Sequence, residues 1–229
     1  MSASPANSVH VTLKLATSLD GRIAAASGES RWITGPEARL EVHKLRAAAD
    51  AVLTGSGTAV ADDPELTARL PAPAPRQPLR VVLDTRLRLP VRSRLIATLD
   101  QAPLLVIGAA GAVTLAARAK LEKSGAETAL VAPAGPHGGV DLQAALGFLA
   151  EARGVRRVLV EAGGRLAAAF IAAGLVNRLE WFRAPILLGG DGRPVIEALR
   201  LQRLSEAAAF RRLALREIGA DLWETYEPA

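Results

Sequence analysis

The sequence predicts a single α/β domain with a mixed, mostly parallel β-sheet flanked by helices. Through the middle of the chain, short runs of Val, Leu and Ile alternate with segments whose apolar residues have helical spacing. Strand, helix and strand in succession form a crossover unit, which makes the two strands parallel. Near the end, two strand-like segments meet at Gly219, and this pattern predicts a terminal antiparallel hairpin.

Each expected element follows from a local pattern of residues. Val9–Ala16 alternates apolar and polar side chains, which is typical of a strand with one apolar face. A helix is expected from about Thr34 to Ala49. Pro36 suits its first helical position, and Glu37 suits the positive end of the helix dipole.

The other elements follow from the same two periodicities. Strands are expected at Ile23–Ala26, Asp50–Thr54, Leu79–Leu83, Leu104–Ile107, Thr128–Val131, Val158–Val160, Asn177–Leu188, Ala207–Glu217 and Asp221–Tyr226, and helices at Ala112–Lys123, Leu142–Ala152 and Arg165–Ala173. Ala61–Leu66 reads as a polar loop or single helical turn, Leu70–Pro78 as a stiff surface connection, and Arg88–Asp100 as irregular. We expect Met1–Ser8 to be a disordered tail and residues 9–229 to form one domain.

The composition excludes several classes of function. The absence of cysteine rules out disulfides and thiolate metal sites. The three histidines are far apart in the sequence, so we expect no metal site built from histidines. The net charge of +5 comes from scattered arginines, and aromatic residues are few, which favours an anionic small molecule over nucleic acid. No apolar run is long enough to cross a membrane, and the N-terminus lacks the pattern of a signal peptide. We therefore expect a soluble cytoplasmic protein.

One segment has the build of a phosphate-binding turn. The apolar run Val158–Val160 predicts a buried strand, Gly163 and Gly164 follow, and a helix comes next. Glycines let the backbone approach an anion, and the amides at a helix start point toward it. Glu161 cannot help to bind phosphate, so we expect it to meet an uncharged part of the ligand. The alternative is an ordinary strand-to-helix turn with a solvated Glu161.

Polar or glycine-rich segments follow four of the expected strands. They are Ala16–Asp20, Thr54–Asp62, Asp84–Arg86 and Glu161–Gly164. Ligands of open α/β sheets bind at the carboxyl ends of the strands, so this pattern favours one shared site. The chain lacks the dinucleotide fingerprint, the phosphate loop of nucleotide hydrolases and the nucleophile elbow of serine hydrolases.

Several motifs occur together in a specific order. They are Lys14–Ala24 (KLATSLDGRIA), Ser27–Thr34 (SGESRWIT), Leu45–Ala47 (LRA), Thr58–Arg69 (TAVADDPELTAR) and Val158–Phe170. Together they closely resemble the reductase domain of the bacterial riboflavin-biosynthesis deaminase–reductase, which has a dihydrofolate-reductase-like fold. The resemblance extends from about Val9 to Tyr226.

The resemblance implies an NADPH-dependent reduction of 5-amino-6-(5-phosphoribosylamino)uracil to its ribitylamino product. By position, the residues implied to bind NADPH are Ala16, Trp32, Thr58, Asp62, Thr85, Gly163, Gly164, Arg165, Leu166, Ala167, Ala168 and Ala169. Those implied to bind the substrate are Ser30, Arg46, Leu66, Arg69 and Glu161. Arg86 follows Thr85 and would supply a cation for the adenosine 2′-phosphate of NADPH.

The residue types allow two interpretations at several of these positions. Arg46 and Arg69 can grip a phosphate by paired hydrogen bonds, or they can be ordinary solvated arginines. Trp32 can contact the cofactor or anchor the packing of its loop. Asp63 is expected to form or cap a turn, more so than Asp62.

The proton required for reduction of an imine has two candidate donors. These are Asp62 and Glu161, and a proton relayed through water is the alternative. Lys14 lies on the polar face of the first strand and can approach either anionic ligand.

The resemblance also raises questions of partners. The family's zinc deaminase half is not expected here, so we expect a stand-alone reductase, or a related reductase whose substrate has changed, with any deaminase as a separate protein. A homodimer is expected from the apolar terminal strands. Two other functions stay open: reduction of another heterocycle such as a pteridine or folate, and a non-catalytic nucleotide-binding module.

Overall fold

The computed structural model describes residues 9–72, 76–135 and 138–229, and the chain divides into two compact units. The first unit contains His43–Leu159 together with residues 9–10. The second contains Val11–Val42 and Val160–Ala229. Helix α1 (Pro36–Ala48) begins in the second unit and ends in the first, and strand β7 (Arg157–Glu161) runs from the first into the second.

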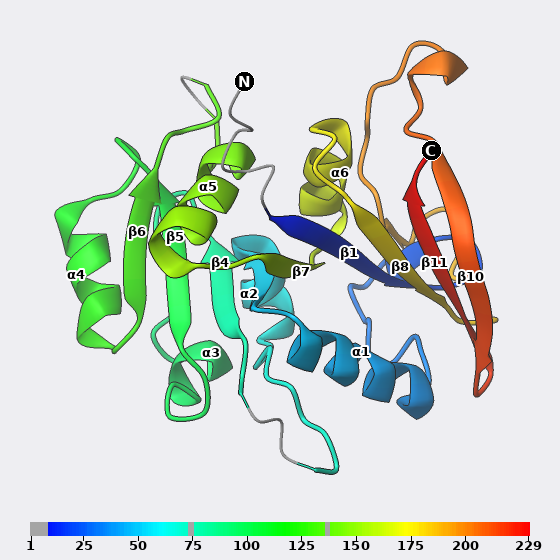
Figure 1. Ribbon diagram of the computed structural model, residues 1–229, viewed down its shortest axis with the longest axis horizontal. Helices are drawn as coiled ribbons and strands as arrows, with labels where there is room; N and C mark the ends of the chain where they lie inside the picture. The colour runs from blue at the N-terminus through cyan, green and yellow to red at the C-terminus, as the bar shows by residue number, and fades with distance from the viewer. Residues whose placement is uncertain (1–8, 73–75, 136–137) are drawn as a thin grey trace. The chain divides into compact units, whose positions relative to one another are not determined.

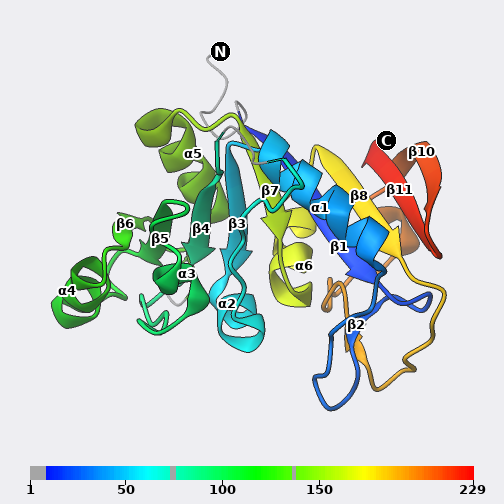
Figure 2. The same cartoon turned by 90° about the horizontal axis from the view of Figure 1, so that it is seen from below.

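Four parallel strands form the sheet of the first unit. They pair in the order β3 (Ala51–Gly55), β4 (Leu79–Leu83), β5 (Leu104–Ala109) and β6 (Glu127–Val131). The helices of this unit are α2 (Ser56–Asp62), α3 (Arg94–Ala97), α4 (Leu115–Lys123) and α5 (Leu142–Arg153). Figure 2 shows α2 directly after the carboxyl end of β3.

The core of the first unit is aliphatic. Val52, Val82 and Val106 lie on three neighbouring strands, are fully buried, and pack with Leu121 of α4. Strands covered on both faces read as continuous apolar runs, which explains why the sequence pattern located them. Two polar residues are also fully buried on these strands, Thr54 of β3 and the charged Arg80 of β4.

Parallel and antiparallel strands meet in the second unit. Strand β1 (His10–Thr17) pairs in parallel with β8 (Arg178–Arg183), and β8 pairs antiparallel with β11 (Asp221–Pro228). Strand β10 (Phe210–Ile218) completes the C-terminal hairpin with β11, and the two lie side by side in orange and red in Figure 1. The smaller elements are β2 (Arg22–Ala24) paired with β9 (Arg193–Pro194), helix α6 (Gly164–Ala172), and the short 3₁₀ helix Leu204–Glu206.

The mixed, mostly parallel sheet with an antiparallel C-terminal hairpin confirms the predicted fold class. Strand β4 has the predicted bounds, and the hairpin turns at Gly219, whose φ of 59° is left-handed. Such a conformation favours glycine because it has no Cβ to clash.

The structure differs from the sequence-based predictions in four local elements. Ser56–Asp62 forms helix α2, whereas the sequence predicted a glycine-rich segment and at most one helical turn farther along. The expected irregular segment Arg88–Asp100 contains helix α3, and strand β9 was not foreseen. The segment Asn177–Leu188 was expected to be a strand that bends or reaches a sheet edge at Pro185. Strand β8 instead ends at Arg183, before this proline, whose missing N–H cannot join a strand ladder.

The expected tail Met1–Ser8 and part of the expected surface connection Leu70–Pro78 lie outside the described residues. The prediction of a single domain stays a prediction. None of the helices in the described ranges is long and apolar enough to span a membrane. Within the same ranges, no group of three or more His, Cys, Asp or Glu side chains is placed to hold a metal ion.

Candidate functional site

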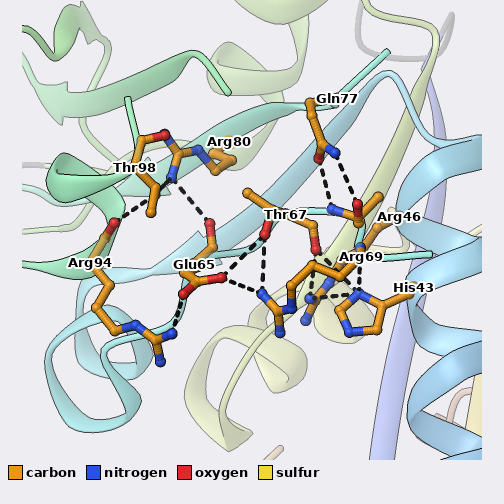
Figure 3. Close-up of polar contacts among 10 residues, drawn as sticks. His43, Arg46, Glu65, Thr67, Arg69, Gln77, Arg80, Arg94 and Thr98 are labelled. Atoms are coloured by element: carbon orange, nitrogen blue, oxygen red, sulfur yellow. Dashed lines mark hydrogen bonds and ion pairs between the residues drawn. The ribbon is translucent and has the colours of Figure 1, made fainter. Parts of the chain in front are cut away.

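A buried loop in the first unit holds two of the residues predicted to bind substrate. This segment, the Asp63–Arg69 loop, follows α2 without regular secondary structure, yet Leu66, Thr67 and Ala68 are buried. Asp63 and Leu66 have left-handed backbones, with φ of 41° and 56°. Buried backbone groups outside helices and strands need other partners, and here nearby side chains supply them (Figure 3).

Arg46 and Arg69 both bind Thr67. Arg46 comes from α1, and its Nη1 donates to the carbonyl oxygen of Thr67 at 3.1 Å. Arg69 Nη1 donates to the Thr67 hydroxyl at 3.1 Å and to the Glu65 carboxylate at 2.5 Å. The structure therefore brings together the two arginines predicted to grip a phosphate, and it contradicts the interpretation that both are simply solvated.

His43 contributes to the same arrangement from α1. The backbone N–H of Arg69 donates to His43 Nδ1 at 3.1 Å, and Arg46 Nη1 lies 3.5 Å from that nitrogen. The same Nδ1 also lies 3.2 Å from the carbonyl oxygen of Thr67. His43 thus fixes the backbone at Arg69.

The Glu65 carboxylate lies between two cations. It accepts hydrogen bonds from Arg69 and from Arg94 of α3. Burial alone would raise the pKa of Glu65, but the charges of Arg69 and Arg94 and the hydrogen bonds of Arg94 and Thr67 outweigh it, and the pKa is lowered. An ionised Glu65 holds Arg69 in one orientation, and Arg46 and Arg94 keep the region net positive.

The expected role of Asp63 agrees with its contacts. It lies at the carboxyl end of α2, and its side chain accepts from the backbone N–H of Arg94 at 2.8 Å. Asp62 and Thr58, both implied to bind NADPH, lie on α2. The side chain of Asp62 is exposed at the last position of this helix, and Thr58 is half-buried.

A tight turn follows β4 and carries two further predicted cofactor residues. Asp84 is buried, and its carboxylate accepts from the backbone N–H groups of Arg86 at 3.4 Å and Arg88 at 2.5 Å. Thr85 is half-buried there, and the Arg86 and Arg88 side chains are exposed. The turn therefore holds two cations at the carboxyl end of a strand, and Arg88 was missed by the sequence analysis.

Glu161 in the second unit forms a buried ion pair. Its side chain lies at the carboxyl end of β7, and its carboxylate is 3.1 Å from Lys14 Nζ of β1. Glu161 is only 8% exposed, so the interpretation of a solvated glutamate is wrong. The alternation of β1 placed Lys14 on its polar face, but nothing in the sequence identified Glu161 as its partner.

Packing explains one of the two glycines that follow β7. A Cβ on Gly164 would lie 2.5 Å from the carbonyl oxygen of Pro194, so this position requires glycine for packing within the second unit. Gly163 precedes α6, and no side chain caps the helix at this residue. The binding of a phosphate by these amides stays a prediction.

The residues of α6 differ in how far they can meet a ligand. Ala167 and Ala168 are buried, whereas Arg165 and Ala169 are exposed, and Leu166 is half-buried. Of the residues predicted along this helix, Arg165 offers a charged side chain to an anion. Its Nε lies 3.5 Å from the carboxylate of Glu197.

Trp32 is held by an arginine instead of by packing. Its side chain is 69% exposed, and the Arg39 guanidinium lies 4.5 Å from the centre of its ring. Arg39 also donates to the carbonyl oxygen of Thr34 at 2.8 Å. The interpretation of Trp32 as a packing anchor is therefore wrong, and its ring is accessible for stacking. Ser30 and Ala16, also in this unit, are half-buried.

Asp20, the acidic residue of the Ser18–Gly21 turn, has a structural role. Its carboxylate accepts from the Ser18 hydroxyl at 2.6 Å and from the backbone N–H groups of Leu188 at 3.2 Å and Gly189 at 2.8 Å. This motif, on which the family resemblance partly rests, therefore joins two loops of the second unit.

Four residues of this arrangement were not predicted: Thr67 within the Asp63–Arg69 loop, and His43, Gln77 and Arg80, which support that loop. One signal existed: an arginine inside the apolar run of β4 requires buried acceptors. The identity of those acceptors could not be found without the fold.

Known proteins are similar to this chain in both sequence and fold. The family model described as RibD C-terminal domain matches residues 9–223. The riboflavin biosynthesis protein RibD of Mycobacterium tuberculosis is 37% identical over 215 residues, which are 93% of this chain and 52% of that protein. The structure of Acinetobacter baumannii RibD is 32% identical, with a TM-score of 0.83 over 96% of this chain and 58% of that one.

A more distant likeness concerns the fold alone. Dihydrofolate reductase from Enterococcus faecalis, solved in complex with NADP(H) and RAB-propyl, is 13% identical with a TM-score of 0.52 and covers 96% of each chain. The present chain spans little more than half the length of its curated RibD relatives. It covers 52% of the M. tuberculosis protein and 58% of the Escherichia coli protein.

Proposed function

Because the chain belongs to the RibD C-terminal domain family, we propose that it is an NADPH-dependent reductase of riboflavin biosynthesis. Its substrate would be 5-amino-6-(5-phosphoribosylamino)uracil and its product the corresponding ribitylamino compound. The observation that carries this proposal is the placement of Arg46 and Arg69 on the two polar groups of one buried residue, Thr67.

The phosphate of the substrate is assigned to these two arginines. Guanidinium groups bind phosphate oxygens through paired, charge-assisted hydrogen bonds, and two of them held by a common residue form a preorganised anion site. Arg69 is 54% exposed at its side chain, so it can still donate to a ligand. Leu66, buried in the same loop, would shape the wall beside it.

The cofactor is assigned to the predicted NADPH residues. The dihydrofolate reductase of similar fold was solved with NADP(H), which supports a nicotinamide dinucleotide. The backbone amides at the start of α6 and the exposed side chain of Arg165 suit a diphosphate, because helix amides and a cation both favour negative charge. Arg86 and Arg88 suit the additional 2′-phosphate that distinguishes NADPH from NADH.

The mechanism requires positioning and one proton. Bound NADPH supplies the hydride, and the chain must orient the sugar C1′ and exclude water. Glu161 and Ser30 would hold the uncharged part of the substrate. Of the two candidate acids, Glu161 is buried with its carboxylate 3.1 Å from Lys14 Nζ, whereas the side chain of Asp62 is exposed. We therefore favour the pair as the proton source over Asp62.

The direct test follows NADPH oxidation by absorbance with the purified protein and the proposed substrate. We expect turnover with NADPH, slower turnover with NADH, and none with dihydrofolate or dihydropterin. Turnover of dihydrofolate would instead support a reductase of another heterocycle. Binding of NADPH without turnover of either substrate would support a nucleotide-binding module and contradict the proposal.

The assembly and the cellular context are part of the proposal. Leu213 and Leu215 are exposed on β10, which fits a homodimer formed through the C-terminal hairpin. The reaction would take place in the cytoplasm. Light scattering coupled to size-exclusion chromatography tests the dimer.

A further inference from the structure

Gln77 makes a reciprocal pair of hydrogen bonds with the backbone of the Asp63–Arg69 loop. Its Oε1 accepts from the N–H of Ala68 at 2.8 Å, and its Nε2 donates to the carbonyl oxygen of the same residue at 2.9 Å. A neighbouring strand would satisfy a backbone in the same way. Figure 3 shows Gln77 on the opposite side of this backbone from Arg46 and Arg69.

Arg80 supports the loop at Glu65. Its side chain is fully buried in β4, and Nη1 donates to the carbonyl oxygen of Glu65 at 3.2 Å. The same guanidinium donates to the Thr98 hydroxyl at 2.6 Å, the Thr98 carbonyl at 3.1 Å and the carbonyl oxygen of Ala102. Arg80 thus joins the loop to the segment that follows α3.

The chemistry of Arg80 is unusual for a buried strand position. Burial lowers its pKa to about 10, with the charges of Glu65 and Asp100 opposing this shift, so the side chain is charged at neutral pH. A buried ion costs free energy that an apolar residue of similar size would not. An apolar residue, however, would leave the carbonyl groups of Glu65, Thr98 and Ala102 without this donor.

These supports lie on either side of Thr67. Arg80 holds the loop at Glu65, two residues before Thr67, and Gln77 holds it at Ala68, directly after. Thr67 is the residue that both phosphate-binding candidates contact. We propose that Gln77 and Arg80 are positioning residues, which fix Thr67 and thereby align Arg46 and Arg69 for the phosphate of the substrate. This inference rests on the proposed function.

The test compares Gln77→Met with Gln143→Met. Met has nearly the length of Gln but neither hydrogen-bonding group, and Gln143 is exposed on α5, which makes it a matched control. Loss of two backbone hydrogen bonds predicts a substrate KM raised about tenfold or more, with kcat and the KM for NADPH changed less than about twofold. Gln143→Met should leave all three constants unchanged. Arg80→Lys keeps the charge but loses the planar fork, and we expect the same selective rise in substrate KM.

Amide hydrogen exchange gives a readout independent of turnover. In Gln77→Met, exchange at Ala68 and Arg69 should become faster, while amides of α5 keep their protection. Unchanged exchange at these two residues would overturn the proposal, as would faster exchange with an unchanged substrate KM. A lower melting temperature with unchanged kinetics would show a purely structural role and would also overturn it.

Failure of the proposed function gives a distinct result. In that case the wild-type protein shows no NADPH oxidation with the proposed substrate. Affinity for ribose 5-phosphate, measured by calorimetry, then replaces KM. Weaker binding in Gln77→Met than in Gln143→Met supports the positioning role, and equal binding, or no binding to the wild type, overturns it.

Discussion

Thr67 is buried, yet its hydroxyl and its carbonyl each contact one arginine of the candidate site. A threonine in a regular helix or strand would use its carbonyl in the backbone ladder. Because the Asp63–Arg69 loop has no ladder, this carbonyl is available to Arg46. The irregular backbone is thus the reason that a single residue can orient two cations.

Replacement of Arg46 by alanine tests this arrangement at the level of one residue. Removal of a charge-assisted hydrogen-bond donor is expected to raise the substrate KM by about ten- to a hundredfold, because such bonds contribute about 1.5–3 kcal/mol. The KM for NADPH should change far less. Arg118→Ala on α4, which removes a half-buried arginine paired with Glu122, is the control and should leave both constants unchanged. Equal effects of Arg46→Ala on both KM values would count against the phosphate assignment.

The contribution of Asp20 to the stability of the fold is expected to depend on pH. The hydrogen bond from the Ser18 hydroxyl is the largest effect on the pKa of Asp20, and it lowers this pKa. Desolvation raises the pKa, whereas the N–H groups of Leu188 and Gly189 lower it further. The pKa therefore falls to about 2 from its ordinary value of 3.8. A folded pKa below the unfolded one means that Asp20 stabilises the fold fully above about pH 4 and loses this contribution as the pH falls toward 2.

The corresponding variant is Asp20→Asn, compared by urea unfolding at several pH values. The wild type should be more stable than the variant near neutral pH, and the difference should shrink as the pH falls through the window between the two pKa values. Glu151→Gln, an exposed substitution on α5, serves as the control. A difference that does not vary with pH would contradict the prediction.

At the scale of elements, α6 begins where the chain packs against itself. Glu197 donates its backbone N–H to the carbonyl oxygen of Gly164 at 3.0 Å, and the carbonyl of Pro194 lies over the position of a Gly164 side chain. The glycine pair was interpreted from the sequence as room for a phosphate. For Gly164, the contact with Pro194 already explains the absence of a side chain, and Gly163 remains the candidate for approach to an anion.

Gly164→Ala therefore has an expected cost that is independent of any ligand. The added Cβ would lie 2.5 Å from a backbone oxygen, which a rotamer change cannot relieve, and we expect a loss of about 1–3 kcal/mol in the free energy of unfolding. Gly147→Ala in α5 is the matched control, since its Cβ would meet nothing within 4 Å. Alanine there should stabilise the helix by about 0.5–1 kcal/mol. Equal melting temperatures for the two variants would contradict this account.

At the scale of the whole molecule, the predicted ligand residues are distributed over both units. Arg46, Arg69 and Arg86 belong to the first unit, and Trp32 and Gly163 belong to the second. A ligand that binds only the folded chain stabilises it in proportion to the logarithm of its concentration. The coenzyme is thus a probe of the folded chain.

Thermal unfolding should report this linkage. NADPH at about a hundred times its Kd is expected to add about 2.7 kcal/mol to the free energy of unfolding. NADH at the same concentration should add less, because it lacks the 2′-phosphate assigned to Arg86 and Arg88. Arg86→Ala should reduce the difference between the stabilisation by NADPH and the stabilisation by NADH. Equal melting temperatures with and without NADPH would contradict cofactor binding.

The sequence alone determined those features that depend on neighbours along the chain. The apolar run of β4, Pro36 at the start of α1 and the left-handed Gly219 between β10 and β11 each result from local backbone geometry or side-chain periodicity. The resemblance of its motifs to a known reductase family also implied that Arg46, Arg69 and Glu161 are substrate-binding candidates.

Only the tertiary structure decided what those candidates contact. The partners Arg46 and Thr67, Gln77 and Ala68, Arg80 and Thr98, and Lys14 and Glu161 are between 9 and 147 positions apart in the sequence. No periodicity encodes such pairs, because they arise when separate elements pack and leave buried polar groups that must find partners. The sequence therefore identified which residues are available for an anion site, and the packing around a buried loop determined how these residues are held.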